Sequence, residues 1–167
     1  TVRARKIRVP NNKNDNKSND RSMAREFAFQ FLFHLQLPIF DSVKKELLSQ
    51  EDDQLLEKTY EELQMAIPCR PEGEPRNFAI TLLKGVLENY YSLNSLIEDN
   101  LEHWKIERLS KVDLTILLLS IYELTIFKET PHKVVMNEAI ELGKKFSTVD
   151  SNSFINGVLD KIHQNAQ

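Results

Sequence analysis

The sequence is poor in the residues that form covalent cross-links and tight turns. Its 167 residues include 1 cysteine, 4 glycines and 6 prolines. A single cysteine permits no internal disulfide and no cysteine-rich zinc site, so we expect a reducing, cytoplasmic compartment. So few glycines and prolines favour long helices over many short strands joined by turns.

Long apolar runs are also missing. The longest, Leu114 to Phe127, is interrupted by Glu123 and is shorter than the ~20 residues that a membrane span needs. The basic beginning of the sequence contains no apolar segment of the kind found in secretory signals. We therefore expect neither a membrane span nor a secretory signal, and one compact domain for a chain of this length.

Patterns typical of metal sites and catalytic sites are absent as well. The four histidines (His34, His103, His132 and His163) lie far apart, and none is at ligand spacing from a cysteine or a carboxylate. Cys69 lies in a proline-rich loop without a nearby histidine, and no glycine-rich phosphate loop is present. We predict no metal, no cofactor and no enzymatic activity.

Charge is distributed unevenly along the chain. Residues 1–25 hold eight basic and two acidic residues, a net charge of +6, whereas residues 26–167 carry a net charge of −9. A basic arm on an acidic body is typical of proteins that bind polyanions, although a solubilising tail has the same composition. Because residues 1–20 lack apolar periodicity, we expect them to be flexible and residues 21–167 to form the folded domain.

Apolar residues at helical spacing predict an all-α domain of about seven helices. These helices are expected over residues 22–37, 41–67 (two), 77–101 (one or two), 111–127, 131–146 and from about residue 151 onward. Ser110 and Asp113 fit a capping box at the start of the segment over residues 111–127. That segment is apolar nearly all round, so it belongs in the middle of the core.

The first predicted helix carries a stripe that suits nucleic acid. Arg25, Phe29 and Phe33 fall at helical spacing, opposite the apolar face that includes Phe27 and Phe31. A cation followed by two rings, next to a basic arm, is a platform for the phosphates and unpaired bases of a single strand. The alternative is that Phe29 and Phe33 pack beneath a second helix, and periodicity alone favours this alternative.

A polar turn over residues 146–154 precedes the last helix. Asp150 or Ser151 is well placed as the N-cap of that helix. The amides at a helix N-terminus also bind phosphate groups. Composition leaves both interpretations open.

Three stretches of the chain resemble the NusB family of transcription antitermination factors. Residues 21–33 (RSMAREFAFQFLF) resemble its opening helix, and residues 109–113 with 122–124 resemble its central helix. The longest match covers residues 131–146 (PHKVVMNEAIELGKKF), Asp150-Ser151 and residues 154–161 (FINGVLDK). The matches occur in the family's order and extend from Arg21 to about Ile162.

The resemblance implies a fold of two small helical bundles packed together and an adaptor without enzymatic activity. It implies binding to boxA, a single-stranded RNA element of ribosomal RNA leaders, as a heterodimer with the small-subunit ribosomal protein NusE. Further implied partners are NusA, NusG and RNA polymerase, in a complex that suppresses termination and supports ribosomal RNA transcription. Some members form homodimers through the RNA-binding face, so a homodimer is a possible state.

The resemblance also assigns roles to single residues. Two arginines match its basic RNA contact, one phenylalanine matches an aromatic position that is usually tyrosine, and the turn and helix start before residue 155 match positions that face RNA. Together with the stripe, the expected RNA-binding residues are Arg21, Arg25, Phe29, Phe33, Asp150, Ser151 and Phe154. Asp113 matches an acidic position that faces the ribosomal protein.

One departure from the family pattern bears on affinity. Ser22 and Met23 stand where the family usually has consecutive arginines, so we expect weaker binding and a flatter salt dependence. Our hypothesis is that the basic residues upstream compensate for this loss: Arg3, Arg5, Lys6 and Arg8. Two alternatives remain open: the RNA-binding module of a ribosomal RNA cytosine methyltransferase, if the sequence is a fragment, and a helical protein-interaction domain without RNA affinity.

Overall fold

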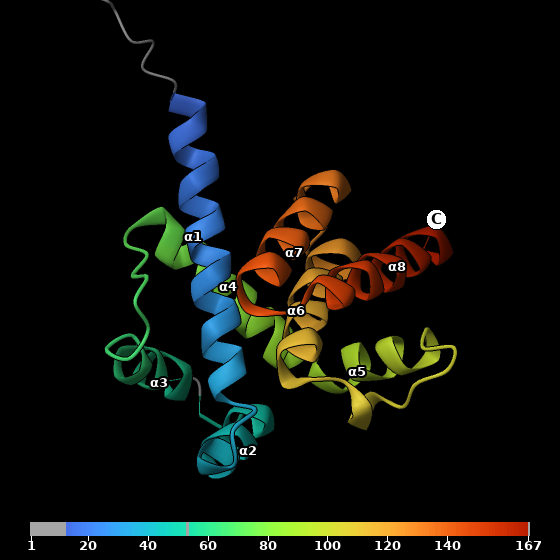
Figure 1. The fold of residues 1–167 in the computed structure, drawn as a ribbon. Helices are drawn as coiled ribbons and strands as arrows, with labels where there is room; N and C mark the ends of the chain where they lie inside the picture. Colours follow the sequence, from blue (N-terminus) through green and yellow to red (C-terminus); the bar gives the residue numbers. More distant parts are fainter. Residues whose placement is uncertain (1–12, 53, 167) are drawn as a thin grey trace, which may run out of the picture.

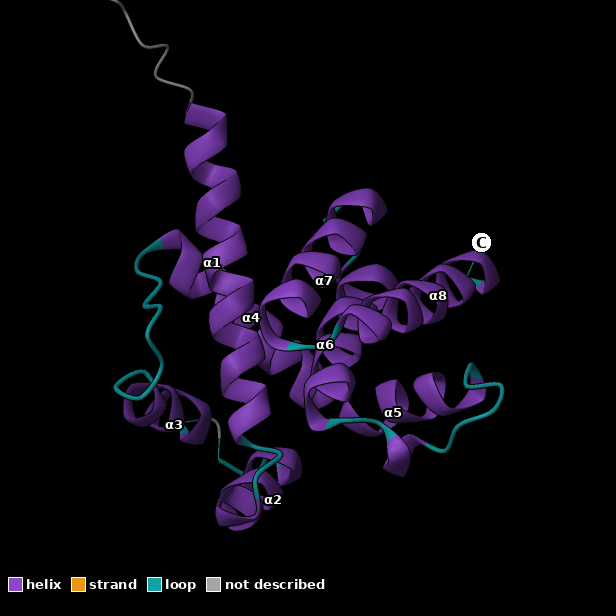
Figure 2. Cartoon of the chain, viewed as in Figure 1, coloured by secondary structure: helices purple, strands orange, loops and turns teal. Residues whose placement is uncertain are grey.

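The computed structural model describes residues 13–52 and 54–166, and it is helical, without strands, over those ranges (Figures 1 and 2). The eight α-helices are α1 (Lys13–His34), α2 (Asp41–Ser49), α3 (Leu55–Leu63), α4 (Glu74–Glu88), α5 (Tyr90–Asp99), α6 (Lys111–Tyr122), α7 (His132–Phe146) and α8 (Val149–Asn165). The all-α prediction is confirmed. The count rises to eight because the predicted segment 77–101 divides at Asn89 into α4 and α5.

The first helix begins earlier than predicted. Residues 13–20 are helical, so the prediction of a flexible arm over residues 1–20 is wrong for them, and its remainder lies outside the described residues. Once the packed turns after Arg21 have formed a helix, each further turn adds hydrogen bonds without a new nucleation cost. The start of α1 projects past the other helices in Figure 1, and residues 17–20 are exposed.

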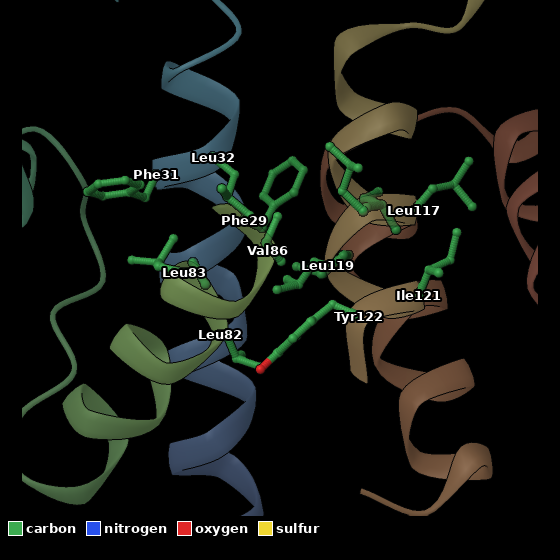
Figure 3. Packing of buried hydrophobic residues seen from close by; sticks show 14 of the residues in the cluster. Phe29, Phe31, Leu32, Leu82, Leu83, Val86, Leu117, Leu119, Ile121 and Tyr122 are labelled. Carbon is green, nitrogen blue, oxygen red and sulfur yellow. The ribbon is translucent and has the colours of Figure 1, made fainter. Parts of the chain in front are cut away.

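The helices form two groups, α1–α4 and α5–α8, that meet along α6 (Figure 1). In the first group α1 packs on α4, and in the second α7 packs on α8. Helix α6 contacts α1 and α4 as well as α5, α7 and α8. All its residues from Thr115 to Tyr122 are buried, as its apolar composition predicted, and Figure 3 shows several of them facing residues of α1 and α4.

A glycine permits close packing of α4 against α6. A Cβ atom at Gly85 would overlap the ring of Tyr122, so only a residue without a side chain fits there. A second glycine, Gly143, has the same role between α7 and the Asn152 side chain of α8. The first approach brings α4 close to α6, and the second brings α7 close to α8.

Helix α6 ends in a wide turn, the π-helical segment η3 (Glu123–Phe127). The Lys128 N–H donates to the carbonyl of Glu123 at 3.0 Å, and Lys128 has a left-handed conformation with φ 55°. This turn ends the helix and holds the Glu123 side chain inside the protein, where it is 1% exposed. Within the described ranges, we find no helix both long and apolar enough for a membrane span.

Two helix starts test the capping predictions. The Ser110 hydroxyl accepts the N–H of Asp113 at 3.0 Å, which confirms Ser110 as the N-cap of α6. At α8 the N-cap is Thr148, whose hydroxyl accepts the N–H of Ser151 at 3.3 Å. The expectation of Asp150 or Ser151 as N-cap is therefore wrong, because α8 begins at Val149 and both residues lie in its first turn.

Candidate nucleic-acid interface

Arg25 lies inside the protein and does not face solvent. Its side chain forms a bidentate pair with Glu123, with Nε donating to Oε1 at 2.8 Å and Nη2 donating to Oε2 at 2.9 Å. A second carboxylate, Glu138 on α7, lies 3.7 Å from Nη1. The expectation that Arg25 is a surface contact for phosphate is wrong, because α6 and α7 cover this side of α1 and neutralise the guanidinium internally.

Phe29 is also buried, with 2% of its surface exposed. Its ring packs against Phe146 of α7, with ring centroids 4.8 Å apart, and lies 6.2 Å from that of Phe33. For Phe29 the prediction of a stacking platform is wrong, and the alternative of packing beneath a second helix is confirmed. Phe33 is only half-buried, so part of its ring remains accessible.

Arg21 keeps its side chain 31% exposed. Its guanidinium pairs with Glu74 at 2.8 Å and lies 4.3 Å from the centroid of Phe78. Glu74 is itself half exposed, and an ion pair in water is worth at most about 1 kcal/mol. A phosphate group can therefore compete for this arginine, which remains a candidate RNA contact.

Asp113 connects the start of α6 to the turn between α7 and α8. Its two carboxylate oxygens accept hydrogen bonds from the hydroxyls of Ser147, at 2.6 Å, and Ser151, at 2.9 Å. The residue is 7% exposed. The carboxylate is thus occupied within the chain, and the expectation that it faces a partner protein stays a prediction. Its role here is to fix the turn on which Asp150 lies.

The predicted turn residues converge on one surface pocket. Asp150, Ser151 and Phe154 line it together with Asp113. The connection between α5 and α6 also lines the pocket, through Trp104 and Arg108. Sequence reasoning missed these two residues, and their only local signal is a tryptophan among charged residues between two helices.

The pocket and the first helix are joined through Phe146, the last residue of α7. Its ring packs on Phe29 of α1, and its neighbour Ser147 donates to Asp113 of α6. Lys145, just before it, pairs with Glu26 of α1. The turn and the first helix are therefore neighbours, joined through the half-buried Phe146 and Ser147 and the exposed Lys145.

Metal binding finds no support at this surface or elsewhere in residues 13–52 and 54–166. Those ranges contain no group of three or more histidine, cysteine, aspartate or glutamate side chains placed to hold a metal ion. What the turn, the pocket and the exposed face of α1 offer is flat rings, separate cations and hydroxyl groups. Such a combination suits a single-stranded nucleic acid, whose bases are flat and whose phosphates are charged.

Comparisons with known proteins agree with this fold. The family model described as "NusB family" matches residues 22–164. The transcription antitermination protein NusB of Clostridium perfringens is 54% identical over 85 residues, which are 51% of this chain and 63% of that protein, so the match spans less than two thirds of this relative. The structure of NusB from T. maritima superposes with a TM-score of 0.69 at 30% identity, covering 88% of this chain and 93% of the other.

A second solved structure shows the same fold. It contains the antitermination factors NusB and NusE in complex with double-stranded RNA, and it superposes with a TM-score of 0.67 at 24% identity over 88% of this chain and 98% of the other. The family model covers nearly the whole described region, from the first turns of α1 to the last turn of α8. This chain belongs to the NusB family.

Proposed function

We propose that this protein is a transcription antitermination factor that binds boxA-type single-stranded RNA together with NusE and supports ribosomal RNA transcription. The observation that carries the proposal is the family match over residues 22–164. The name of the Clostridium perfringens relative and the partners in the solved NusB–NusE–RNA complex support it. NusA, NusG and RNA polymerase are the further partners under this proposal.

The RNA surface in this proposal is smaller than the sequence suggested. Arg21 supplies a cation at one end, Phe33 supplies a partly accessible ring, and Phe154 supplies a second ring beside the Asp150–Ser151 turn. Flat rings stack on unpaired bases, and cations neutralise the phosphates between them. Arg25 and Phe29 act beneath this surface by holding α1 against α6 and α7.

The partner in this proposal is a basic ribosomal protein, which suits the charge of the body. Residues 26–167 carry a net charge of −9. Complementary charge speeds the encounter of two proteins and favours the correct partner over others.

Anisotropy of a labelled boxA strand tests the proposal. The full chain is titrated into boxA and into an unrelated strand of equal length, with and without NusE, over a salt series. We expect boxA to bind more tightly than the unrelated strand and the preference to increase when NusE is present. Equal, weak binding to both strands that NusE does not change would contradict the proposal.

Two variants sharpen this experiment. Arg21→Gln is expected to weaken binding to all strands and to reduce the salt slope by about one, since it removes one phosphate contact. Phe154→Ala is expected to reduce the preference for boxA. Tyr91→Ala is the matched control, because Tyr91 is an exposed aromatic residue, 71% accessible, on α5 and does not line the pocket.

The protein-interaction domain is the second candidate function. The observation in its favour is the burial of Arg25 and Phe29, which removes two of the seven expected RNA contacts from the surface. Under this alternative, NusE binds the chain with the same affinity whether or not RNA is present. Calorimetric titration of NusE with and without boxA separates the two functions.

A further inference from the structure

The one tryptophan of the chain lies at the surface, where its ring is not used for packing. Trp104 is 56% exposed, in the connection between α5 and α6. Among the described residues it forms no ring–ring contact and has no cation over its face. An indole left in water at a pocket is a typical anchor for a ligand, since its burial on binding is favourable.

Trp104 and Phe154 together separate two adjoining pockets. One pocket contains Arg108 and Asp150, and the other contains Lys161 and Glu102, while both rings line each of them. Lys161 and Glu102 pair with each other at 3.0 Å, so that side of the rings is neutralised internally. The free charges are on the side of Arg108 and Asp150.

Arg108 and Asp150 line the same pocket without pairing. Within residues 13–52 and 54–166, the Arg108 side chain makes no ion pair and the Asp150 carboxylate accepts no hydrogen bond. Asp113, the other carboxylate in the pocket, is satisfied by Ser147 and Ser151. A fitting ligand therefore presents an anion to Arg108, a hydrogen-bond donor to Asp150 and a flat ring to Trp104.

A nucleotide has these three groups in one unit. Its phosphate suits the guanidinium, its base suits the indole face, and an exocyclic amino group donates to a carboxylate, as cytosine N4 donates to aspartate or glutamate. Uracil presents a carbonyl oxygen in the place of that amino group, and an oxygen facing a carboxylate is repelled. The charge pattern of the pocket therefore suits a base with an amino group better than a base without one.

We propose that Trp104, Arg108 and Asp150 form a nucleotide subsite in which Trp104 stacks on an unpaired base, Arg108 binds its phosphate and Asp150 selects a base with an amino group. The inference rests on the proposed function and extends its RNA surface from α8 across to the connection between α5 and α6. Trp104 is the stacking residue of this subsite and Asp150 its specificity-determining residue.

The single tryptophan gives the experiment a direct signal. The full chain is titrated with short oligocytidylate and oligouridylate while the tryptophan emission is recorded, because stacking on a base quenches the indole. We expect quenching by both strands, with oligocytidylate half-saturating at a concentration several-fold lower. Asp150→Asn is expected to reduce this difference, since an amide both donates and accepts hydrogen bonds.

Anisotropy with variants supplies the second readout. Trp104→Ala is expected to weaken binding of oligocytidylate by about tenfold, the effect of losing one stacked base. Arg108→Gln is expected to weaken both strands equally. The matched controls are Tyr91→Ala and Arg70→Gln, an exposed aromatic residue and an exposed arginine that do not line the pocket and are expected to leave affinity unchanged.

The outcomes separate this inference from the proposed function. If boxA binds with the expected preference while tryptophan emission does not change and Trp104→Ala binds normally, the subsite is wrong and the proposed function stands. If quenching is equal for the two strands and Asp150→Asn has no effect, the assigned selectivity is wrong. If neither boxA nor the short strands bind, both proposals fail.

Discussion

Arg25 and Glu123 lie 98 positions apart in the sequence and form a bidentate ion pair in the core. Their side chains are 4% and 2% exposed. The Thr130 hydroxyl also donates to Glu123, at 2.8 Å, so the carboxylate joins α1, the end of α6 and the start of α7. Burial removes water from both charges, and only their close, bidentate contact offsets this loss of hydration.

Removing one charge of this pair is expected to destabilise the fold strongly. Glu123→Gln should lower the free energy of unfolding by about 3 kcal/mol or more, because the Arg25 guanidinium stays buried with only the more distant Glu138 nearby. The double variant Arg25→Met with Glu123→Leu should lose less unfolding free energy than Arg25→Met alone or Glu123→Leu alone. Urea denaturation measures both, and a double variant that loses the sum of the two single effects would contradict this account.

The Asp113 carboxylate is expected to stabilise the turn that carries the candidate site. Asp113→Ala removes the acceptor for Ser147 and Ser151 and should cost about 2 kcal/mol, as for hydrogen bonds to charged groups. It should also accelerate amide exchange over residues 147–151. Asp150 is an exposed neighbour, so Asp150→Ala should change the unfolding free energy by less than about 0.5 kcal/mol. Equal losses for the two variants would contradict this role of Asp113.

Two glycines are expected to respond in opposite ways to alanine. Gly85→Ala places a methyl group into the Tyr122 ring and should destabilise by about 1–3 kcal/mol. A Cβ atom at Gly157 would meet no other atom within 4 Å, and the residue lies inside α8. Gly157→Ala should therefore stabilise the folded protein by up to about 1 kcal/mol. Thermal melts of the two variants and of Gly85→Ala combined with Tyr122→Leu test this, since the combination should recover part of the loss.

Stability is expected to fall at alkaline pH. Burial raises the pKa of the Cys69 thiol from 9.0 to about 11 and the pKa of the Tyr60 hydroxyl from 10.0 to about 12. The unfolded chain loses these protons at lower pH than the folded protein, so their contribution is complete below about pH 9. It declines between pH 9 and 11 for Cys69 and between pH 10 and 12 for Tyr60.

Comparing two proteins isolates the thiol from the other groups that titrate in this range. Urea midpoints of the unchanged chain and of Cys69→Ala are measured at pH 8 and pH 10.5. The variant should lose less stability between these two values, because it lacks the buried thiol. Parallel losses would show that the Cys69 proton is not linked to folding.

Much of the fold follows from local patterns in the sequence. The spacing of apolar residues predicts where the helices lie, and the lack of a polar face on residues 114–122 predicts the central position of α6. The N-cap at Ser110 follows from residue type and position alone. These features depend on residues near one another in the chain, which is why the sequence suffices for them.

The candidate site depends on neighbours that periodicity does not reveal. A stripe opposite a core face is exposed only when a helix has one packing partner, but α1 is covered by α4 on one side and by α6 and α7 on another. Phe27 therefore meets Tyr60 while Phe29 meets Phe146. Trp104 and Phe154 line the same pockets only because the connection between α5 and α6 lies beside α8, which no local pattern encodes.

The central position of α6 has a consequence for how the molecule opens. This helix supplies core side chains to both groups, so neither group keeps a closed interior once the other separates from it. Unfolding is then cooperative across the whole body, and an RNA or protein ligand bound at the α8 end also protects the α2–α3 end by mass action. One helix thereby couples the stability of surfaces that share no residue.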